Sequence, residues 1–259
     1  MANISPDLSS RRDTIANYVI MHGDISVEEL ADTCGVSVMT IYRDISVLEK
    51  AGIVHREHGR IRATASGLHE ATAQYRMAQG VEEKKQMGKA AAALIPASAS
   101  VIIDDSTSAI WAIRQLEQTS GLSVVTNSLL VAQELRERPK NSLFFLGGEY
   151  QSWAEATLGP HTISALEKVD ADLCLISASG IRGDQLFHPY ADVAAVKAKM
   201  MQAAAKTILL LDHSKFARRA LHRFGSISEV DTVVVDADAP AQKVAQLREN
   251  GAKVVVAER

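Results

Sequence analysis

The chain has 259 residues, of which 47% are hydrophobic and 23% charged, a balance that excludes a disordered protein and favours two folded domains. It holds no run of about 18 apolar residues and no N-terminal signal pattern, so we expect a cytoplasmic protein that does not enter a membrane. The net charge of −3 and the pI of about 6.2 speak against a large basic surface for nucleic acid.

The first 35 residues predict two helices. Residues 11–21 place apolar side chains at helical spacing, which predicts a first helix. Ser26 is followed three residues later by Glu29, a capping box that predicts the start of a second, short helix. Gly35 predicts the end of that helix, because glycine readily adopts the left-handed conformation that closes helices.

A third helix and a hairpin complete the predicted N-terminal domain. Ser37 can cap the third helix, which carries an apolar stripe at positions i, i+4 and i+7. The tight turn between the second and third helices indicates a helix-turn-helix. Residues 53–63 read as a small hairpin, which predicts a wing. We therefore predict a small α+β winged helix-turn-helix domain over residues 1–63.

Nine side chains of this domain are candidate DNA contacts. In a helix-turn-helix, the N-terminal end of the last helix faces the base edges in the major groove. Arg43 can pair with a guanine or a phosphate, and Val38 or Met39 can touch a thymine methyl group. Residues 1–62 hold seven basic and nine acidic residues, but residues 37–62 hold five basic and three acidic. The candidates are Ser37, Val38, Met39, Thr40, Tyr42 and Arg43 of the helix and Arg56, His58 and Arg60 of the wing.

The rest of the chain reads as a linker and an α/β domain. Residues 64–80 lose periodicity and predict an interdomain linker, part of which can be helical. Over residues 81–259, apolar, β-rich runs alternate with helical stretches, as expected of a largely parallel sheet covered on both faces. The runs are residues 101–103, 122–125, 143–146, 173–176, 207–211, 232–235 and 254–256.

Polar clusters follow five of these runs. The carboxyl ends of parallel strands meet at one edge of a sheet, where loops and helix N-termini present N–H groups to anions. Hydroxyls beside a helix start, paired glycines and a lysine among carboxylates suit a ligand that has both a phosphate and sugar hydroxyls. One such cluster alone is more often a cap or a turn, but five at one edge favour a binding site. The clusters are residues 104–108, 126–128, 147–149, 177–180 and 212–215.

The helix-turn-helix segment resembles a known family. Residues 37–45, Ser-Val-Met-Thr-Ile-Tyr-Arg-Asp-Ile, followed by residues 48–53 and a His-Gly turn, resemble the signature of the DeoR-type repressors of bacterial carbohydrate metabolism. The family commonly has a second arginine in place of Tyr42 and a second glycine in place of Arg60, departures that concern base preference. The resemblance implies a transcription repressor that binds a double-stranded DNA operator.

The resemblance extends over residues 82–236 and implies a sensor of a phosphorylated sugar. In the family this domain is similar to ribose-5-phosphate isomerase, and a phosphosugar is the usual inducer. The resemblance implies that residues 106–108 hold the phosphate with help from Lys215, although the family often has glycine where Ser106 stands. Sugar hydroxyls would then meet Asp104, Asn127, Gly148 and Glu149. The full candidate set is Asp104, Ser106, Thr107, Ser108, Thr126, Asn127, Gly147, Gly148, Glu149, Ser179, Gly180, His188, Lys197 and Lys215.

The strongest alternative is an enzyme, a phosphosugar isomerase with an accessory DNA-binding domain. Such an isomerase needs a carboxylate poised for proton transfer, and residues 177–180 hold none where the resembling isomerase carries an acidic pair. We therefore expect a sensor without catalytic activity. A winged helix that binds a partner protein stays open, with Tyr42 and the acidic balance in its favour.

Three further expectations concern ligands and assembly. His188 either selects one sugar or is an ordinary loop residue. We expect no cofactor and no metal, because Cys34 and Cys174 lie in unrelated segments and the histidines lack metal-ligand spacing. We expect a homo-oligomer whose helix-turn-helix units contact two half-sites, with the effector binding the off-DNA arrangement better.

Overall fold

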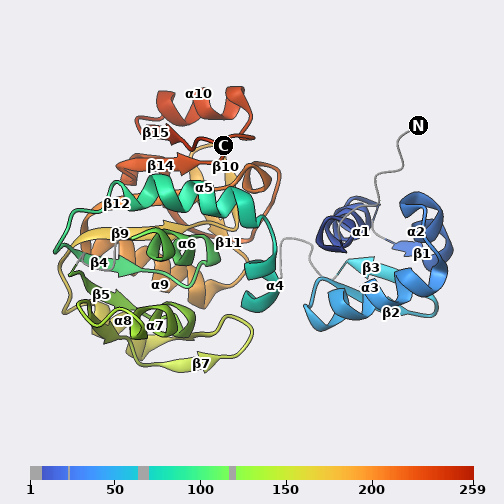
Figure 1. Cartoon of the computed structure of the whole chain (residues 1–259), viewed down its shortest axis with the longest axis horizontal. Helices are drawn as coiled ribbons and strands as arrows, with labels where there is room; N and C mark the ends of the chain where they lie inside the picture. The colour runs from blue at the N-terminus through green and yellow to red at the C-terminus, as the bar shows by residue number, and fades with distance from the viewer. Residues whose placement is uncertain (1–7, 23, 64–69, 117–120) are drawn as a thin grey trace. The chain divides into compact units, whose positions relative to one another are not determined.

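The computed structural model describes residues 8–22, 24–63, 70–116 and 121–259 (Figure 1). It divides into two compact units, Met1–Gln79 and Gly80–Arg259, each with its own core. None of the helices in the described ranges is long and apolar enough to cross a bilayer.

The first unit contains the three predicted helices: α1 (Leu8–His22), α2 (Val27–Cys34) and α3 (Val38–Lys50). The predicted N-caps are confirmed, but in the capping box the Glu29 side chain makes no bond to the Ser26 N–H among the described residues. The Ser26 side chain accepts a hydrogen bond from the Glu29 backbone N–H at 3.1 Å, and the Ser37 side chain accepts one from Thr40 N–H at 3.2 Å. Gly35 closes α2 at a φ of +65°. The apolar stripe of α3 is fully buried: Ile41, Ile45 and Leu48.

The predicted wing is confirmed and has one strand more than expected. Strands β2 (Val54–Glu57) and β3 (Arg60–Ala63) pair antiparallel across a turn at His58 and Gly59. Both turn residues have positive φ, which matches the type I′ turn that suits the twist of two-residue hairpins. A third strand, β1 (Asp24–Ser26), pairs with β3. Its three residues are too few for a strand period to be visible in the sequence.

The segment that we expected to link the domains contains helix α4 (Ala73–Ala78). Residues 64–69 of that segment lie outside the described residues. Ala71 and Tyr75 pack against the core of the first unit, and the Thr72 N–H donates to the Ala51 carbonyl oxygen at 3.4 Å. The two units therefore meet in the chain at Gln79 and Gly80.

The second unit is built on a seven-stranded parallel sheet, and all seven predicted runs are its strands. The spatial order is β15-β14-β12-β9-β4-β5-β6. The connection changes direction between β4 and β9, which makes the gap between these two strands the switch point of the sheet. The strands are β4 (Ser100–Ile103), β5 (Ser123–Thr126), β6 (Ser142–Phe145), β9 (Ala171–Ser177), β12 (Ala204–Leu211), β14 (Thr232–Val235) and β15 (Lys253–Val256).

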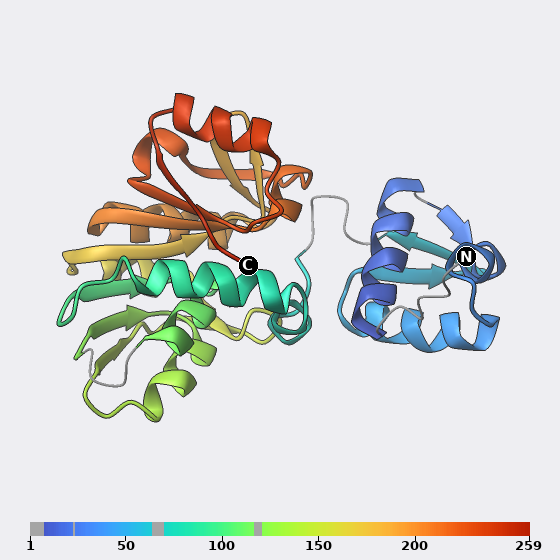
Figure 2. The same ribbon diagram turned by 45° about the horizontal axis from the view of Figure 1, so that its top comes forward.

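Helices cover both faces of this sheet, as predicted for an α/β domain. Helices α5 (Val81–Ala92), α6 (Thr107–Gln115) and α7 (Leu129–Arg136) lie in a row over one face (Figures 1 and 2). Helices α8 (Pro160–Leu166), α9 (Ala191–Gln202) and α10 (Ala241–Glu249) share a buried apolar cluster with the other face. Apolar side chains therefore leave the strands on both sides, which explains the near-continuous apolar runs in the sequence.

Short antiparallel elements beyond the carboxyl ends of the strands were missed by the sequence analysis. Strands β7 (Glu149–Gln151) and β8 (Ala156–Leu158) form a ribbon. A small sheet contains β10 (Gly180–Arg182), β11 (Gln185–His188) and β13 (His222–Ser226). Two 3-10 turns complete the unit, η1 (His213–Phe216) and η2 (Ile227–Glu229). These strands have three to five residues each, so they show no alternation that could have predicted them.

Candidate DNA interface and effector site

The N-terminal end of α3 presents its candidate DNA contacts to solvent. Ile41 and Ile45 anchor one side of the helix in the core, so the side chains of the opposite side face outward. Met39 is 64% exposed and Val38 37% exposed, an unusual degree for apolar side chains at a helix start. Arg43 is exposed beside them. The side chains that could read base edges are therefore accessible in the first unit on its own.

A buried carboxylate holds this helix in place. Asp44 follows Arg43 directly but points into the first unit, where it is 1% exposed. Its two oxygens accept hydrogen bonds from Arg11 Nε at 2.7 Å and Arg12 Nε at 2.9 Å, so the carboxylate joins α3 to α1. The hydrogen bond to Asp44 raises the pKa of Arg11. Asp44 directly precedes Ile45, which belongs to the apolar stripe of α3. This position was the signal in the sequence that could have identified Asp44 as a structural residue.

The wing arginines already have acidic partners. Arg60 donates from Nε to Asp24 Oδ1 at 2.6 Å, and its guanidinium holds the pKa of Asp24 below its ordinary value. Arg56 lies 3.9 Å from a Glu49 oxygen. The guanidinium carbon of Arg56 lies 5.5 Å from the ring centre of half-buried Tyr42, so Tyr42 connects the wing with α3. Of the wing candidates, His58 is the most open, with a side chain 91% exposed.

In the second unit, Asp104 lies at the switch point and is fully buried. Its Oδ1 accepts a hydrogen bond from Ser106 N–H at 3.0 Å, and its Oδ2 accepts one from Ser177 N–H at 2.9 Å. Its Oδ2 also pairs with the ammonium group of Lys197 on α9. The carboxylate thus joins the ends of β4 and β9 and leaves no accessible oxygen for a sugar, so we assign it a positioning role.

Lys197 is the cationic centre of this arrangement. Its Nζ lies 3.3 Å from Asp105 Oδ1 and also contacts Asp104, and all three side chains are buried. Burial alone would lower the pKa of Lys197, but the charges of the two aspartates outweigh burial and raise the pKa. Lys197 therefore stays charged and holds the loop after β4 against α9.

The start of α6 retains free backbone donors. The Ser106 side chain caps the helix by accepting from Ala109 N–H at 3.3 Å. The N–H groups of Thr107 and Ser108, in the first turn, bond to no group in the described part of the chain. Because the first N–H groups of a helix carry partial positive charge, this turn can receive an anionic oxygen. The expected phosphate segment therefore has the backbone chemistry that a phosphate needs.

The start of α7 differs because the chain itself occupies it. Leu129 N–H donates to the Glu155 carbonyl oxygen at 2.8 Å, and the Ser128 side chain accepts from Val131 N–H. Thr126 donates from its hydroxyl to the Ile103 carbonyl oxygen at 2.6 Å. Asn127 donates to the Thr157 carbonyl oxygen at 2.9 Å, whereas its own side-chain oxygen is buried without a hydrogen-bond partner among the described residues. That oxygen is an acceptor available to a ligand hydroxyl.

The paired glycines have unequal roles. The Gly147 carbonyl oxygen accepts from the Thr162 hydroxyl at 2.8 Å. Gly148 has a φ of +151°, and a Cβ there would collide with Thr162 Oγ1 and the Leu158 carbonyl oxygen. Glu149 is exposed on β7 and accepts from Gln151 Nε2 at 3.3 Å. Gly148 is therefore required by packing, while Glu149 is the side chain of this segment that a ligand can reach.

Three candidates after β9 lie in the interior of the second unit. Ser179 N–H donates to the Phe187 carbonyl oxygen at 3.1 Å, and a Cβ on Gly180 would collide with the Arg218 carbonyl oxygen. His188 is 2% exposed, and its Nδ1 accepts from Tyr190 N–H at 3.1 Å. These contacts join the small antiparallel sheet and the start of α9 to the end of β9.

The fifth cluster, residues 212–215, interacts with a lysine that the sequence analysis missed, Lys84. Lys215 Nζ lies 3.6 Å from Asp212 Oδ2, and Asp212 Oδ1 accepts from Ser214 N–H at 3.0 Å. Burial would raise the pKa of Asp212, but the charges of Lys215 and Lys84 and the hydrogen bonds from Ser214 lower it below its ordinary value. Lys84, on α5, is 6% exposed. Lys84 precedes Met87 by three residues and so lies on the same side of the helix as this buried residue. That spacing was the signal in the sequence that could have identified Lys84 as buried.

Among the residues that the structure describes, one group has the composition of a metal site. His213, Asp236 and Asp238 offer ligand atoms within 4.8 Å of one another. His213 Nδ1 already lies 2.5 Å from Asp236 Oδ2, and Arg259 donates to Asp238 at 2.6 Å. The three side chains thus have partners within the protein, and we assign no metal to them.

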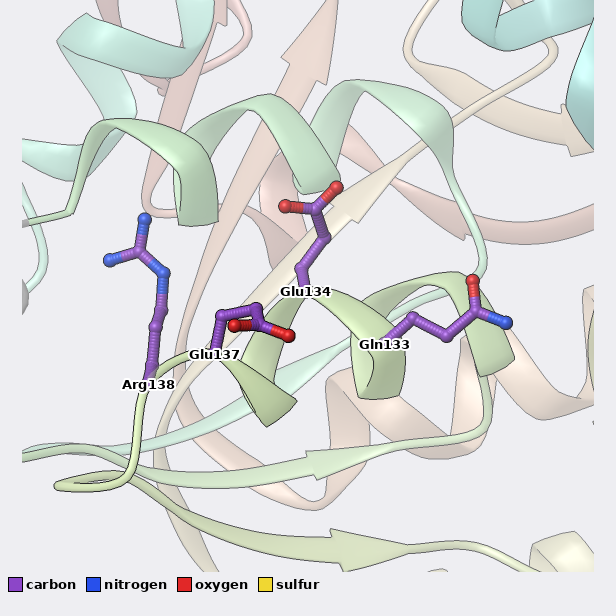
Figure 3. A pocket seen from close by; sticks show the side chains of 4 residues that line it. All are labelled: Gln133, Glu134, Glu137 and Arg138. Atoms are coloured by element: carbon purple, nitrogen blue, oxygen red, sulfur yellow. The ribbon is translucent and has the colours of Figure 1, made fainter.

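A surface hollow of about 280 Å³ lies near the C-terminal end of α7 (Figure 3). Glu134 in this hollow pairs with Arg114, and Arg138 donates to the Leu116 carbonyl oxygen at 2.7 Å. The carboxyl edge of the sheet lies at the opposite, N-terminal end of α7, so this hollow is separate from the candidate effector site. Its lining residues are Gln133, Glu134, Glu137 and Arg138.

Two family comparisons agree with the division of the chain into a first unit with a candidate DNA interface and a second unit with a candidate effector site. Residues 79–237 match the family described as "DeoR C terminal sensor domain", and residues 11–66 match "DeoR-like helix-turn-helix domain". The chain belongs to the DeoR family. The resemblance found in the sequence is thus confirmed, and this DeoR-family chain is a DNA-binding regulator rather than an isomerase.

Relatives of this DeoR-family chain are similar over almost its whole length. The HTH-type transcriptional repressor CsqR of Escherichia coli is 29% identical over 247 residues, which cover 95% of this chain and 94% of the relative. The glycerol-3-phosphate regulon repressor of Escherichia coli is 31% identical over 234 residues, which cover 90% and 92%. Among solved structures, ribose 5-phosphate isomerase A of Methanocaldococcus jannaschii aligns over 53% of this chain and 55% of its own, with 13% identity and a TM-score of 0.38.

Proposed function

We propose that this protein represses a carbohydrate catabolism operon and leaves its operator when a phosphorylated sugar binds the second unit. The observation that carries the proposal is the first turn of α6 at the switch point, where buried Thr107 and Ser108 have N–H groups without a partner among the described residues, in a chain whose other unit exposes the start of α3. The repressor names of two relatives, one of them a glycerol-3-phosphate regulon repressor, support repression and a phosphorylated effector. A regulator of the chromosome acts in the cytoplasm.

On the DNA side, we assign base reading to the first turns of α3. Arg43 is the candidate for a guanine or a phosphate, and Val38 and Met39 for thymine methyl groups. Ser37 and Thr40 bond to each other at 2.9 Å and can contact phosphate oxygens. Arg56 and Arg60 have acidic partners, so they contribute less to phosphate binding than their number suggests. The wing therefore positions the domain, with His58 at its tip.

On the effector side, we assign the phosphate to the start of α6 and the sugar to its surroundings. The free N–H groups of Thr107 and Ser108 would receive phosphate oxygens, and Lys215 would add charge. The partnerless Asn127 oxygen and exposed Glu149 would accept from sugar hydroxyls. The remaining members of the predicted set hold the loops and the start of α6 in place: Asp104, Ser106, Thr126, Gly147, Gly148, Ser179, Gly180, His188 and Lys197.

Induction follows if the two states bind the effector differently. Two copies contact two half-sites, and the effector units set the spacing of the reading units. A phosphosugar can release the repressor from DNA only if it binds the free repressor more tightly than the DNA-bound repressor. The difference between these two binding free energies sets how far the sugar weakens operator binding. The proposal therefore requires that operator DNA weaken sugar binding by the same factor by which sugar weakens operator binding.

Two substitutions separate the two activities. Arg43→Ala should weaken operator binding about 10- to 100-fold without changing effector affinity. Lys215→Ala should weaken effector binding and leave operator affinity unchanged. Lys50→Ala, at the exposed far end of α3, is the matched control for Arg43.

Gel shifts with the chain's own promoter region and calorimetry with phosphosugars measure both affinities. A thermal-shift screen first identifies the sugar, since a ligand of the folded state raises the melting temperature. If both losses always occur together, or if the protein converts the sugar to a product, the proposal is wrong.

A further inference from the structure

The outer edge of β6 carries an apolar surface without a charge. β6 is the last strand in the sheet order, so one of its edges has no partner strand in the described ranges. Leu143, Phe144 and Phe145 are 42%, 54% and 38% exposed. Large apolar side chains on an unpaired strand edge are characteristic of surfaces that pair with another chain.

The opposite edge of the same sheet differs in sequence. β15 begins with Lys253 and is followed by Glu258 and Arg259, so charges flank that edge on both sides. Charged residues, lysine above all, hinder pairing of exposed strands. Residues 141–148, which include β6, hold no charge. The sheet is therefore protected at one edge and open to pairing at the other.

The backbone of β6 has donors and acceptors directed outward. Ser142 N–H donates to the Leu122 carbonyl oxygen at 2.9 Å, and Leu146 N–H donates to Thr126 at 2.8 Å. Alternate residues of a strand direct their N–H and C=O groups to opposite edges, so those of Leu143 and Phe145 point away from β5. Phe144 lies between these two residues, and its side chain is on the other face of the sheet.

We propose that β6 pairs antiparallel with β6 of a second copy, about a twofold axis at Phe144. Leu143 would exchange two hydrogen bonds with the partner's Phe145, and Phe145 two with the partner's Leu143. Phe144 then faces the partner's Phe144 in a non-hydrogen-bonded pair, whose Cα atoms lie about 4.5 Å apart. Aromatic pairs of this kind stabilise sheets, and such an isologous contact closes at two copies.

The charges at the two ends of this segment favour a second copy as the partner. Exposed Lys140 precedes the uncharged segment and exposed Glu149 follows it. An antiparallel copy brings the basic end of one segment to the acidic end of the other, whereas a parallel copy would bring like charges together. The inference rests on the proposed function in one respect, that reading two half-sites requires two copies.

A cysteine cross-link tests the register. Phe144→Cys in a Cys34→Ser background should form a disulfide-linked dimer under mild oxidation, because the expected Cα separation lies within the range of about 4.4–6.8 Å that disulfides span. Val256→Cys in the same background, on the other edge of the sheet and 42% exposed, should stay monomeric on a non-reducing gel. Equal cross-linking of both variants, or no cross-linking of either, overturns the proposal.

Sedimentation equilibrium tests the affinity. Phe144→Glu should weaken dimerisation at least about tenfold, since two carboxylates would face each other on the axis, and Val256→Glu should leave dimerisation unchanged. Circular dichroism checks the fold, and the cross-link decides if Phe144→Glu does not fold. A wild-type monomer at micromolar concentration overturns the proposal. If the wild-type protein does not bind operator DNA although the Phe144→Cys variant in the Cys34→Ser background still cross-links, the proposed function alone is contradicted.

Discussion

In each unit of the molecule a buried charge is held by two opposite charges, Asp44 in the first unit and Lys197 in the second, but the surroundings differ. In the first unit, Asp44 pairs with Arg11 and Arg12, whose side chains are 11% and 29% exposed. In the second unit, Lys197 pairs with Asp104 and Asp105, both almost completely buried. The first arrangement joins the buried side of α3, whose other side is exposed, to α1, while the second lies among the residues of the candidate effector site.

This difference shows how the two sites are built. The candidate DNA contacts at the start of α3 are accessible because their support lies on the opposite face of the helix. At the effector edge, most polar candidates bond to each other and to the backbone, and only a few groups stay available to a ligand. The candidate DNA contacts therefore stay exposed, whereas many polar residues of the candidate effector site are used to hold that site together.

The largest expected effect comes from removing the buried lysine. Lys197→Met leaves two aspartates buried without their cation and should lower the free energy of unfolding of the second unit by about 3–5 kcal/mol. Lys199→Ala, on the same helix and paired at 3.8 Å with Glu167 on the surface, should cost less than about 1 kcal/mol. Urea unfolding monitored by circular dichroism measures both. Equal costs would contradict the assignment of Lys197 as a positioning residue.

Removing the buried charge of Asp44 in the first unit should lower the free energy of unfolding by less. Asp44→Asn removes the charge, but Arg11 and Arg12 can be hydrated, so we expect a loss of about 2 kcal/mol in the first unit. Operator affinity should fall in parallel, because α3 loses its connection to α1. Urea unfolding followed by near-ultraviolet circular dichroism, together with gel shifts, measures the two effects. A stable variant with unchanged operator affinity would show that the two buried charges are not comparable.

Gly147 and Gly148, at the carboxyl edge of the sheet, allow the effect of a new side chain on stability to be compared at two neighbouring positions. Gly148→Ala should destabilise the second unit by more than about 1 kcal/mol, because φ is +151° and the new Cβ collides with Thr162 and Leu158. Gly147→Ala meets nothing within 4 Å and should change stability by less than about 0.5 kcal/mol. Thermal melts of the two variants measure the difference. Similar melting temperatures would show that this turn rearranges freely.

The smallest expected effect is a pH dependence at His213. Desolvation lowers its pKa, but the hydrogen bond and charge of Asp236 outweigh desolvation and raise the pKa above the ordinary value. A raised pKa stabilises the folded state below about pH 6.5, and this contribution is lost as the pH rises through the folded pKa. The melting temperature of the wild type should therefore fall relative to His213→Asn between pH 6 and about pH 8. Parallel curves for the two proteins would contradict this.

Much of the architecture was predictable from the sequence because it depends on local patterns. Seven apolar runs marked seven strands, and Ser26, Gly35 and Ser37 marked helix ends by their own conformational preferences. The prediction of the site was less complete. The sequence correctly placed the polar clusters after the carboxyl ends of the strands. It did not show which side chains of these clusters are free to bind a ligand.

By itself, the sequence determined the winged helix-turn-helix, the parallel sheet and the family, because periodicity, caps and motifs are properties of neighbouring residues. Only the tertiary structure decided that Asp104 and Lys197 satisfy each other, that Arg60 is paired with Asp24, and that β6 remains an open edge. These outcomes depend on residues far apart in the chain. A buried charge or an unpaired strand edge is defined by what the fold brings next to it.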